Sequence, residues 1–250
     1  MDSDLKVLFL AAEAAPFTKV GELADVAGAL PQALRRLGVD VRVMIPRYGN
    51  LRGEAHHFHR IGNSIPVPVG ADLERVHLLE TMAGDVPVYL IWNDQYFANR
   101  ERVYGFNDDP QRFVFFSRAV IAVLGALEWK PDIVHANDWH TAAVPAWLDV
   151  YGKSDPLYKD VATLFTIHNV AYQGVCGRLI LSFGQMAKVE HLSVEPPGQV
   201  NWLAQGIAHA DLVSTVSSTY AHELLSGELD AALAPLLLSL IHISEPTRPY

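Results

Sequence analysis

Two short apolar runs in this sequence end in polar side chains that could do chemistry. They lie within residues 132–140 (DIVHANDWH) and residues 162–174 (ATLFTIHNVAYQG). Buried strands normally end in turn-forming glycine, proline, asparagine or aspartate. These two runs also end in imidazole groups, beside carboxylate and amide groups. In open parallel α/β sheets, ligands bind just outside the carboxyl ends of the strands, so we expect the functional side chains to converge there.

These side chains could serve three kinds of chemistry. His135, Asp138 and His140 are of metal-ligand type, but no nearby glutamate or cysteine completes a ligand set. The histidines of residues 56–59 are equally isolated, so we expect no metal. Serine hydrolysis would need a G-x-S-x-G nucleophile elbow, which the sequence lacks. Hydrogen bonding to a polyhydroxylated ligand suits this mixture best, although His168 taken alone is equally typical of a core histidine bonded to a backbone carbonyl.

Composition and charge narrow the function classes further. The 250 residues are 50% apolar and 19% charged, which is typical of one large or two small globular domains. A net charge of −9 argues against nucleic acid or an anionic membrane as the main partner. Cys176 is the single cysteine, so an intrachain disulfide and a thiolate zinc site are excluded. We see neither a signal-peptide pattern nor an apolar run of about 20 residues, and we expect a cytoplasmic location.

Hydrophobic periodicity predicts the elements that must position these side chains. Besides the two runs above, we predict strands at residues 6–12, 39–46, 75–81, 86–92 and 211–216. Apolar residues at helical spacing predict helices at residues 23–37, 111–127, 141–150 and 220–225. The alternation of strands and helices predicts an α/β fold with a doubly wound, mostly parallel, Rossmann-like sheet.

Local signals refine this outline. Gly84 lies between two predicted strands and predicts a hairpin turn. Pro31 lies within a helical pattern and predicts either a kink or a first-turn position. Ser217 or Ser218 is expected to cap the last helix. Residues 56–68, with their histidines and prolines, are predicted to form an irregular insertion.

The turn between the first strand and helix tests for nucleotide binding. A dinucleotide site needs G-x-G-x-x-G there, but this turn contains only Gly21, which argues against a nicotinamide cofactor. Lys19, Gly21 and a helix N-terminus together suit phosphate oxygens. A solvated lysine beside a turn glycine is the alternative, and the spacing alone leaves it open.

Five motifs in chain order resemble those of bacterial glycogen synthases and plant starch synthases. They are KVGELADVAGALP (residues 19–31), YFANRERVYG (96–105), HANDWH (135–140), TIHNVAYQG (166–174) and a helix–strand segment at residues 201–220. The resemblance covers roughly residues 4–235. Enzymes of this family are retaining glucosyltransferases that extend α-1,4-glucan from ADP-glucose.

The resemblance implies an architecture and a donor side. Such enzymes have two Rossmann-like domains that face each other across a cleft, the GT-B arrangement, and they need no metal or cofactor. This chain would be the N-terminal domain, which carries mainly the acceptor glucan. By resemblance, Lys19 and Gly21 contact the pyrophosphate of ADP-glucose, and Asp25 holds that turn or the nucleotide.

The resemblance also implies residues for the transferred sugar. Tyr104 and Asp138 would line the sugar and acceptor region. His168 would hydrogen-bond the transferred glucose and place its backbone carbonyl near the anomeric carbon, where preoriented dipoles stabilise developing positive charge. Asp138 and His168 are therefore the predicted catalytic residues, and Asn169 of the same motif is a predicted substrate contact.

The sequence departs from the family pattern in three ways. Glu22 stands where the family has a second glycine, so we expect a side chain on permissive backbone and a carboxylate near the diphosphate. Ala204 stands where the family usually has a lysine, which weakens any anion contact there. The family's second domain, with its basic pair, is not in this sequence. Residues 238–250 resemble a translated sequencing adapter, so we expect the native domain to span residues 1–237.

We therefore expect an incomplete, inactive piece of a glycogen/starch synthase. Its full-length parent would transfer glucose from ADP-glucose to the non-reducing end of an α-1,4-glucan with retention. One alternative is another GT-B glucosyltransferase that uses UDP-glucose, and a second is a non-catalytic glucan-binding domain. Neither nucleic acid nor membrane is an expected partner.

Overall fold

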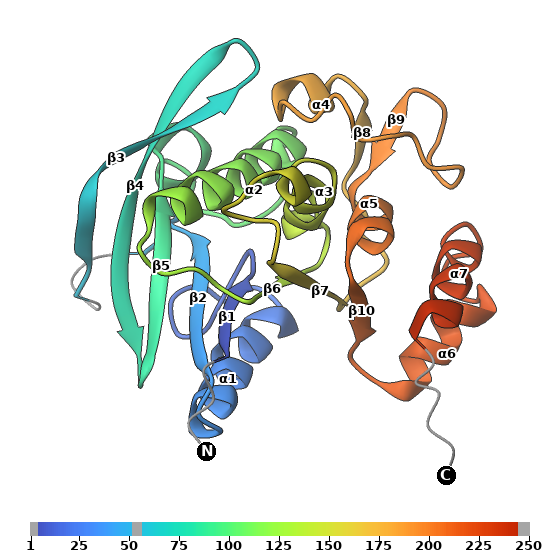
Figure 1. The fold of residues 1–250 in the computed structure, drawn as a ribbon, viewed down its shortest axis with the longest axis horizontal. Helices are drawn as coiled ribbons and strands as arrows, with labels where there is room; N and C mark the ends of the chain where they lie inside the picture. Colours follow the sequence, from blue (N-terminus) through green and yellow to red (C-terminus); the bar gives the residue numbers. More distant parts are fainter. Residues whose placement is uncertain (1–4, 52–56, 245–250) are drawn as a thin grey trace.

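A computed structural model describes residues 5–51 and 57–244 of the chain. In this part the chain builds one eight-stranded sheet with the order β10-β7-β6-β1-β2-β5-β4-β3 (Figure 1). The strands are β1 (Lys6–Leu10), β2 (Asp40–Pro46), β3 (His59–Val69), β4 (Asp72–Ala83), β5 (Val86–Trp92), β6 (Ile133–Asn137), β7 (Ala162–Ile167) and β10 (Leu212–Thr215). The long β3–β4 pair forms one side of the molecule in Figure 1, and the C-terminal helices lie at the other.

The sheet is parallel from β10 to β5, and only β4 and β3 run antiparallel to their neighbours. From β1 the chain winds outward through β2 to β5, and it later returns to the other side of β1 to add β6, β7 and β10. The direction of winding therefore reverses between β1 and β6. Such a switch point opens a crevice at the carboxyl ends of the strands, where ligands of doubly wound sheets bind.

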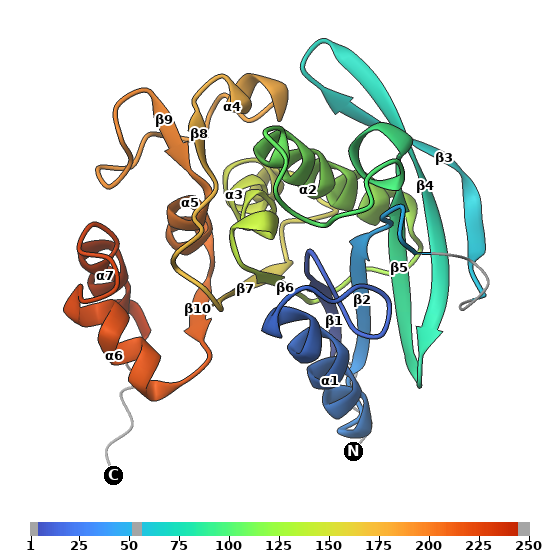
Figure 2. The same cartoon turned by 180° about the vertical axis from the view of Figure 1, so that it is seen from behind.

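Helices cover both faces of this sheet. They are α1 (Glu22–Arg36), α2 (Asp109–Ala126), α3 (Ala143–Val150), α4 (Ile180–Phe183), α5 (Trp202–His209), α6 (Ser218–Ser226) and α7 (Ala234–Ser244). Alternate residues of β1 serve two different cores, because successive side chains of a strand point to opposite faces. Val7 and Phe9 pack with α1, which lies beside β1 and β2 in Figure 2, whereas Leu8 and Leu10 pack with α2, α3 and α5.

The predicted irregular insertion at residues 56–68 is wrong. His59–Val69 forms β3, the edge strand, which pairs with β4 through Pro66–Arg75 and Pro68–Leu73. Proline is confined to edges of sheets because it has no N–H to donate to a ladder. The exposed polar residues of β3 hid the strand pattern. Of the histidine cluster, His56 lies outside the described residues.

Most of the other local predictions agree with the structure. Gly84 has φ of +59° in the turn between β4 and β5. The Ser217 hydroxyl accepts a hydrogen bond from the amide N of Tyr220 and so caps α6. Pro31 lies inside α1, not in its first turn. The predicted domain end at residue 237 falls within α7.

Candidate functional site

The strand-end cluster, Asn137, Asp138 and His168, lies where β6 and β7 end. The amide N of Asp138 donates to the carbonyl of Thr166 at 3.0 Å, which continues the strand pairing by one residue. The Asp138 carboxylate accepts from the amide N of His168 at 2.8 Å and from that of Asn169 at 3.3 Å. Asp138 adopts φ of +57°, a region that non-glycine residues rarely occupy. Left-handed backbone at such a position is typical of functional sites.

Asn137 connects this cluster to β1. Its side-chain Nδ2 donates to the carbonyl of Leu10 at 2.9 Å and to that of His135 at 3.2 Å. Its Oδ1 lies 2.8 Å from Nε2 of His168. The Asn137 side chain is fully buried and thus fastens the ends of β1, β6 and β7 together at the switch point.

Burial sets the charge states of the cluster. It raises the pKa of Asp138 to about 6, with the two backbone N–H groups opposing the shift and the Glu13 carboxylate adding to it. Burial lowers the pKa of His168 to about 4. At neutral pH the imidazole of His168 is therefore uncharged, and the carboxylate of Asp138 is mostly ionised.

A second group of residues surrounds Glu13, which follows β1 and is 2% exposed. The Tyr104 hydroxyl donates to Oε1 of Glu13 at 3.2 Å, and the Tyr104 ring lies 4.7 Å from the ring of His140. Burial holds the pKa of Tyr104 well above its ordinary value, so the phenol stays protonated and can donate. Tyr104 is therefore half-buried against the same edge of the sheet as the strand-end cluster.

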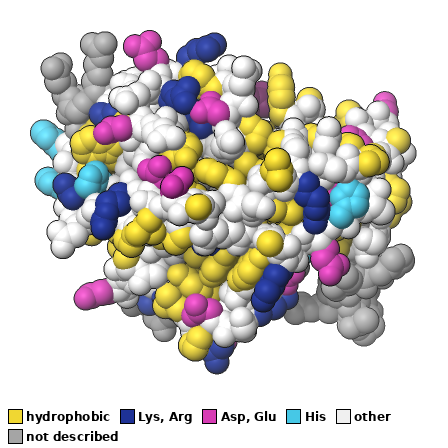
Figure 3. Space-filling model, turned by 90° about the horizontal axis from the view of Figure 1, so that it is seen from above, with side chains coloured by type: hydrophobic (Ala, Val, Ile, Leu, Met, Phe, Trp, Pro, Cys, Tyr) yellow, Lys and Arg dark blue, Asp and Glu magenta, His cyan; other side chains and the backbone are white. Residues whose placement is uncertain are grey.

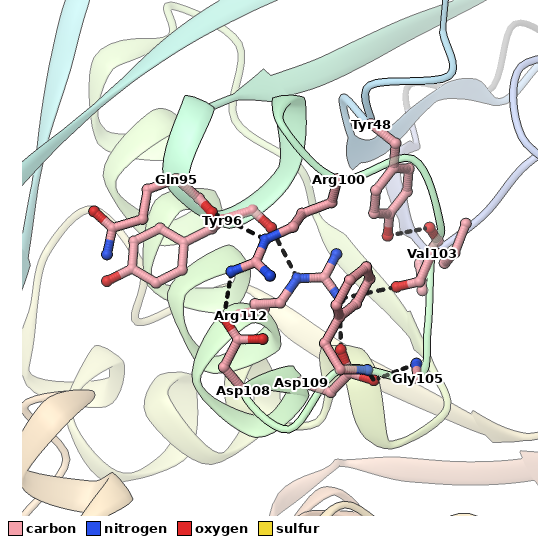
Figure 4. A network of polar contacts seen from close by, with 11 residues as sticks. Tyr48, Gln95, Tyr96, Arg100, Val103, Gly105, Asp108, Asp109 and Arg112 are labelled. Carbon is pink, nitrogen blue, oxygen red and sulfur yellow. Dashed lines mark hydrogen bonds and ion pairs between the residues drawn. The ribbon is translucent and has the colours of Figure 1, made fainter.

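Arg112 of α2 anchors the loop that carries Tyr104 (Figure 4). Its Nε donates to the carbonyl of Tyr96 at 2.8 Å, and its Nη1 donates to the carbonyl of Val103 at 3.0 Å. Nη1 also lies 2.5 Å from Oδ1 of Asp109, whose other oxygen accepts from the amide N of Gly105 at 2.8 Å. A fully buried guanidinium with fixed carbonyl partners leaves this loop little freedom.

The turn before α1 has its own internal partners. Lys19 Nζ lies 2.7 Å from both carboxylate oxygens of Asp25, and both side chains are 56% exposed. The amide N atoms of Val20 and Gly21 donate to the Glu13 carboxylate, the latter at 3.1 Å. Two of the N–H groups that suited a phosphate are thus occupied by Glu13.

Glu22 does not lie on the permissive backbone that the sequence led us to expect. Glu22 is the first residue of α1 and has no positive φ, and Gly21 is extended with φ of −130°. A side chain at position 22 therefore carries no backbone strain, and a carboxylate in the first turn interacts favourably with the helix dipole. Ala204 is fully buried in α5, and its amide N donates to the Asn201 side chain.

The structure thus gathers the predicted residues into two groups. Asp138, His168 and Asn169 share one set of hydrogen bonds, while Gly21 and Tyr104 share the Glu13 carboxylate. Lys19 and Asp25 form an exposed pair beside the second group. Sequence reasoning missed Glu13 and Arg112, and it included Asn137 among the polar strand-end residues without assigning it a role. The position of Glu13 three residues beyond the first strand was the one available signal for it.

The described residues contain no group of three or more histidine, cysteine, aspartate or glutamate side chains that could hold a metal ion. His140 is packed among the rings of Tyr104, Phe113 and Trp139, and burial followed by the nearby Arg112 charge lowers its pKa to about 3. Two cavities in the described residues have volumes of about 270 and 220 Å³. None of the predicted site residues lines either of them.

The distribution of charged side chains and the length of the helices are relevant to nucleic acid and membrane as partners. Figure 3 shows acidic and basic side chains interspersed on one face, around hydrophobic side chains near its centre. None of the helices in residues 5–51 and 57–244 is long and apolar enough to cross a membrane.

Comparison with known proteins decides the family. The sequence profile of the starch synthase catalytic domain matches residues 6–238. The chain belongs to the starch synthase catalytic domain family. It is 43% identical over 245 residues to the glycogen synthase of Moorella thermoacetica, and 40% identical over 240 residues to that of Clostridium kluyveri. These alignments include 95% and 94% of this chain but 48% and 50% of the relatives.

A solved structure supports the same family. The catalytic domain of starch synthase IV from Arabidopsis thaliana, bound to ADP and acarbose, matches with a TM-score of 0.87 and 29% identity. The match covers 97% of this chain and 50% of that structure. The starch synthase fold of residues 5–51 and 57–244 is therefore the Rossmann-like half of a GT-B arrangement, as predicted. The chain spans about half the length of the curated relatives that it matches.

Proposed function

We propose that the full-length parent of this chain transfers glucose from ADP-glucose to the non-reducing end of an α-1,4-glucan with retention. The chain supplies the wall of the cleft that faces the acceptor and the transferred glucose. The observation that carries this proposal is the convergence of Asp138, His168 and Tyr104 at the carboxyl edge of the sheet, in a member of the starch synthase family.

In this proposal the buried groups act on the sugar. Neutral His168 hydrogen-bonds a hydroxyl of the transferred glucose, and its backbone carbonyl lies near the anomeric carbon. Positive charge develops on that carbon as the bond to the diphosphate breaks, and dipoles already in place stabilise it without reorganising. Asp138 contributes by fixing the backbone of His168 and Asn169, whose amide N atoms it accepts from. Tyr104 and Asn169 contact substrate hydroxyls.

The donor side is less complete in this chain. Lys19 reaches the diphosphate by leaving Asp25, with which it is paired in the structure. Gly21 holds the turn in place through the Glu13 carboxylate, and Asp25 holds Lys19 until the donor binds. Because this turn offers a single lysine to the diphosphate and the chain spans about half the length of its relatives, residues 1–250 alone are expected to give no glucosyl transfer. We place the parent enzyme in the cytoplasm, without a metal or cofactor.

A chimera tests the proposal. Residues 1–237 are joined to the C-terminal half of the Moorella thermoacetica glycogen synthase, the 43% identical relative. The chimera is incubated with glycogen and either ADP-[14C]glucose or UDP-[14C]glucose, and incorporated label is counted. We expect incorporation from ADP-glucose, and none from residues 1–250 alone.

The chimera has two matched controls. The intact Moorella enzyme shows that the donated half is competent, and circular dichroism shows that the chimera is folded. A folded chimera without transfer from either donor would overturn the proposal. Higher incorporation from UDP-glucose than from ADP-glucose would identify UDP-glucose as the donor.

A further inference from the structure

Every polar atom of the Asn137 side chain has a partner inside the protein. Nδ2 has two hydrogens, and the carbonyl oxygens of Leu10 and His135 lie 2.9 and 3.2 Å from it. Oδ1 faces Nε2 of His168 at 2.8 Å. The backbone carbonyl of Asn137 accepts from the Thr141 hydroxyl at 2.9 Å. The side chain is fully buried, so water cannot substitute for any of these partners.

The two carbonyl partners fix which end of the amide faces His168. A carbonyl oxygen only accepts hydrogen bonds, so the atom facing Leu10 and His135 must be the NH2 group. The reversed amide would set Oδ1 against two carbonyl oxygens and leave both of them without a donor, which is costly for buried groups. Oδ1 therefore points at the imidazole.

This orientation determines where His168 carries its proton. Oδ1 can only accept, so Nε2 of His168 must be the donor. Burial keeps the ring neutral at pH 7, because it lowers the pKa of His168 to about 4. A neutral imidazole has one N–H, so Nδ1 presents a lone pair. In the described part of the chain Nδ1 has no hydrogen-bond partner, and the side chain is half-buried.

We propose that Asn137 is a positioning residue that holds His168 in the Nε2–H tautomer, with Nδ1 as an acceptor for a hydroxyl of the ligand. The identity of that hydroxyl, on the transferred glucose, rests on the proposed function, whereas the tautomer does not. A lone pair at Nδ1 attracts O–H donors and repels phosphate or carboxylate oxygens. Asn137 thereby makes this position selective for sugar hydroxyls over anionic oxygens.

Nuclear magnetic resonance of the 250-residue chain tests the tautomer directly. Two-bond ¹H–¹⁵N spectra of histidine rings distinguish Nε2–H from Nδ1–H, and the His168→Gln variant assigns the signal. We expect His168 to be predominantly Nε2–H at pH 7. In Asn137→Ala the ratio of Nε2–H to Nδ1–H should fall by roughly fivefold, the factor that one ordinary hydrogen bond is worth.

The controls separate this role from a general effect on folding. Asn201 is also a buried asparagine and caps α5, and Asn201→Ala should leave the His168 tautomer unchanged. If Asn137→Ala does not fold, the His168 tautomer measured in the unsubstituted chain still tests the proposal. A mainly Nδ1–H signal, or an equal mixture, at His168 would overturn the proposal.

A binding measurement keeps this proposal distinct from the proposed function. Titration of the chain with maltoheptaose, followed at the His168 Nδ1 resonance, should shift that signal toward the value of a hydrogen-bonded acceptor. If His168 is Nε2–H but its Nδ1 signal does not respond to the glucan, Asn137 still sets the tautomer. The glucan hydroxyl would then be ruled out as the donor to Nδ1. Inorganic phosphate should not shift the Nδ1 signal.

Discussion

The turn before α1 and the strand-end cluster lie at the same edge of the sheet but are built on opposite physical principles. In the turn, Lys19 and Asp25 form an exposed ion pair with each other. In the cluster, Asn137, Asp138 and His168 are tied by hydrogen bonds to backbone groups of β1, β6 and β7. The turn carries full charges in solvent, whereas the cluster holds a neutral imidazole and a carboxylate out of it.

This difference separates a part that can adjust from a part that is preset. Exposed ion pairs contribute between about 0 and 1 kcal/mol, so Lys19 can exchange Asp25 for a ligand at little cost. Breaking a buried hydrogen-bonded group leaves partners unsatisfied, at about 1–3 kcal/mol for each. The cluster therefore keeps its geometry whether or not a ligand is bound. Four experiments test this contrast.

Acidification should have the largest effect, because it acts on the cluster and on two buried histidines beside it, His135 and His140. Burial holds the pKa of His135 and His168 at about 4 and that of His140 at about 3, below the ordinary value of 6.5. The unfolded chain therefore takes up these protons first, and stability is lost as the pH falls from 6.5 to about 4. Asp138, with its pKa raised to about 6, works in the opposite direction by gaining stability below pH 6.

Since three imidazoles outweigh one carboxyl group, the free energy of unfolding should fall by several kcal/mol between pH 7 and pH 4. Urea denaturation at pH 7, 6, 5 and 4 measures it. A flat profile over this range would show that these histidines are solvated.

Removing the Asp138 carboxylate should cost more than any substitution in the turn. Asp138→Ala leaves the amide N atoms of His168 and Asn169 without their acceptor and places an alanine at φ of +57°. We expect a loss of about 3 kcal/mol in the free energy of unfolding, and no transfer by the chimera. Urea denaturation at pH 7 gives the first value. An unchanged midpoint would mean that the cluster is not preset.

Adding a single methyl group should distinguish the two regions next. In Gly174→Ala the new Cβ would overlap Cε3 of Trp139, at φ of +65°. In Gly21→Ala it would meet Oε1 of Glu13 at an ordinary 3.4 Å, with extended backbone. We expect a loss of about 2–3 kcal/mol for Gly174→Ala, and of at most about 1 kcal/mol for Gly21→Ala.

Thermal and urea unfolding of both alanine variants measure this difference. Gly177→Ala serves as the control, because its Cβ would meet nothing within 4 Å. Equal losses at positions 174 and 21 would contradict the contrast between a packed and an adjustable region.

The smallest effect should come from the exposed pair. Asp25→Asn removes the partner of Lys19, and we expect a loss of about 0.5 kcal/mol that disappears in 1 M salt. Urea denaturation at low and high salt measures it. A loss of more than about 2 kcal/mol would show that Asp25 is a structural anchor.

The sequence predicted those elements whose buried apolar residues recur at the spacing of a strand or a helix. Three strands, β1, β2 and β5, have compact apolar runs, and α2 has an apolar stripe. All four elements were therefore located within a few residues. β3 was missed because an exposed edge strand has no apolar face along most of its length. Its prolines, normally signals against a strand, are tolerated at an edge.

The predicted site residues came from motifs, but the contacts that organise them did not. Glu13 bonds Tyr104 from 91 positions away, and Asn137 bonds Leu10 from 127 positions away. Neither separation leaves a pattern in a single sequence, because only the folded sheet brings those segments together. The backbone conformation of Asp138 was equally invisible, since nothing local distinguishes a left-handed aspartate from a turn residue.

The prolines of β3 also have a consequence for how the protein behaves at high concentration. Residues two apart in a strand direct their backbone nitrogens to the same side, and the pairing with β4 survives Pro66 and Pro68. Both ring nitrogens therefore face outward, where they remove two donors that an approaching strand from another molecule would need. The open side of an eight-stranded sheet is thus blunted against edge-to-edge aggregation.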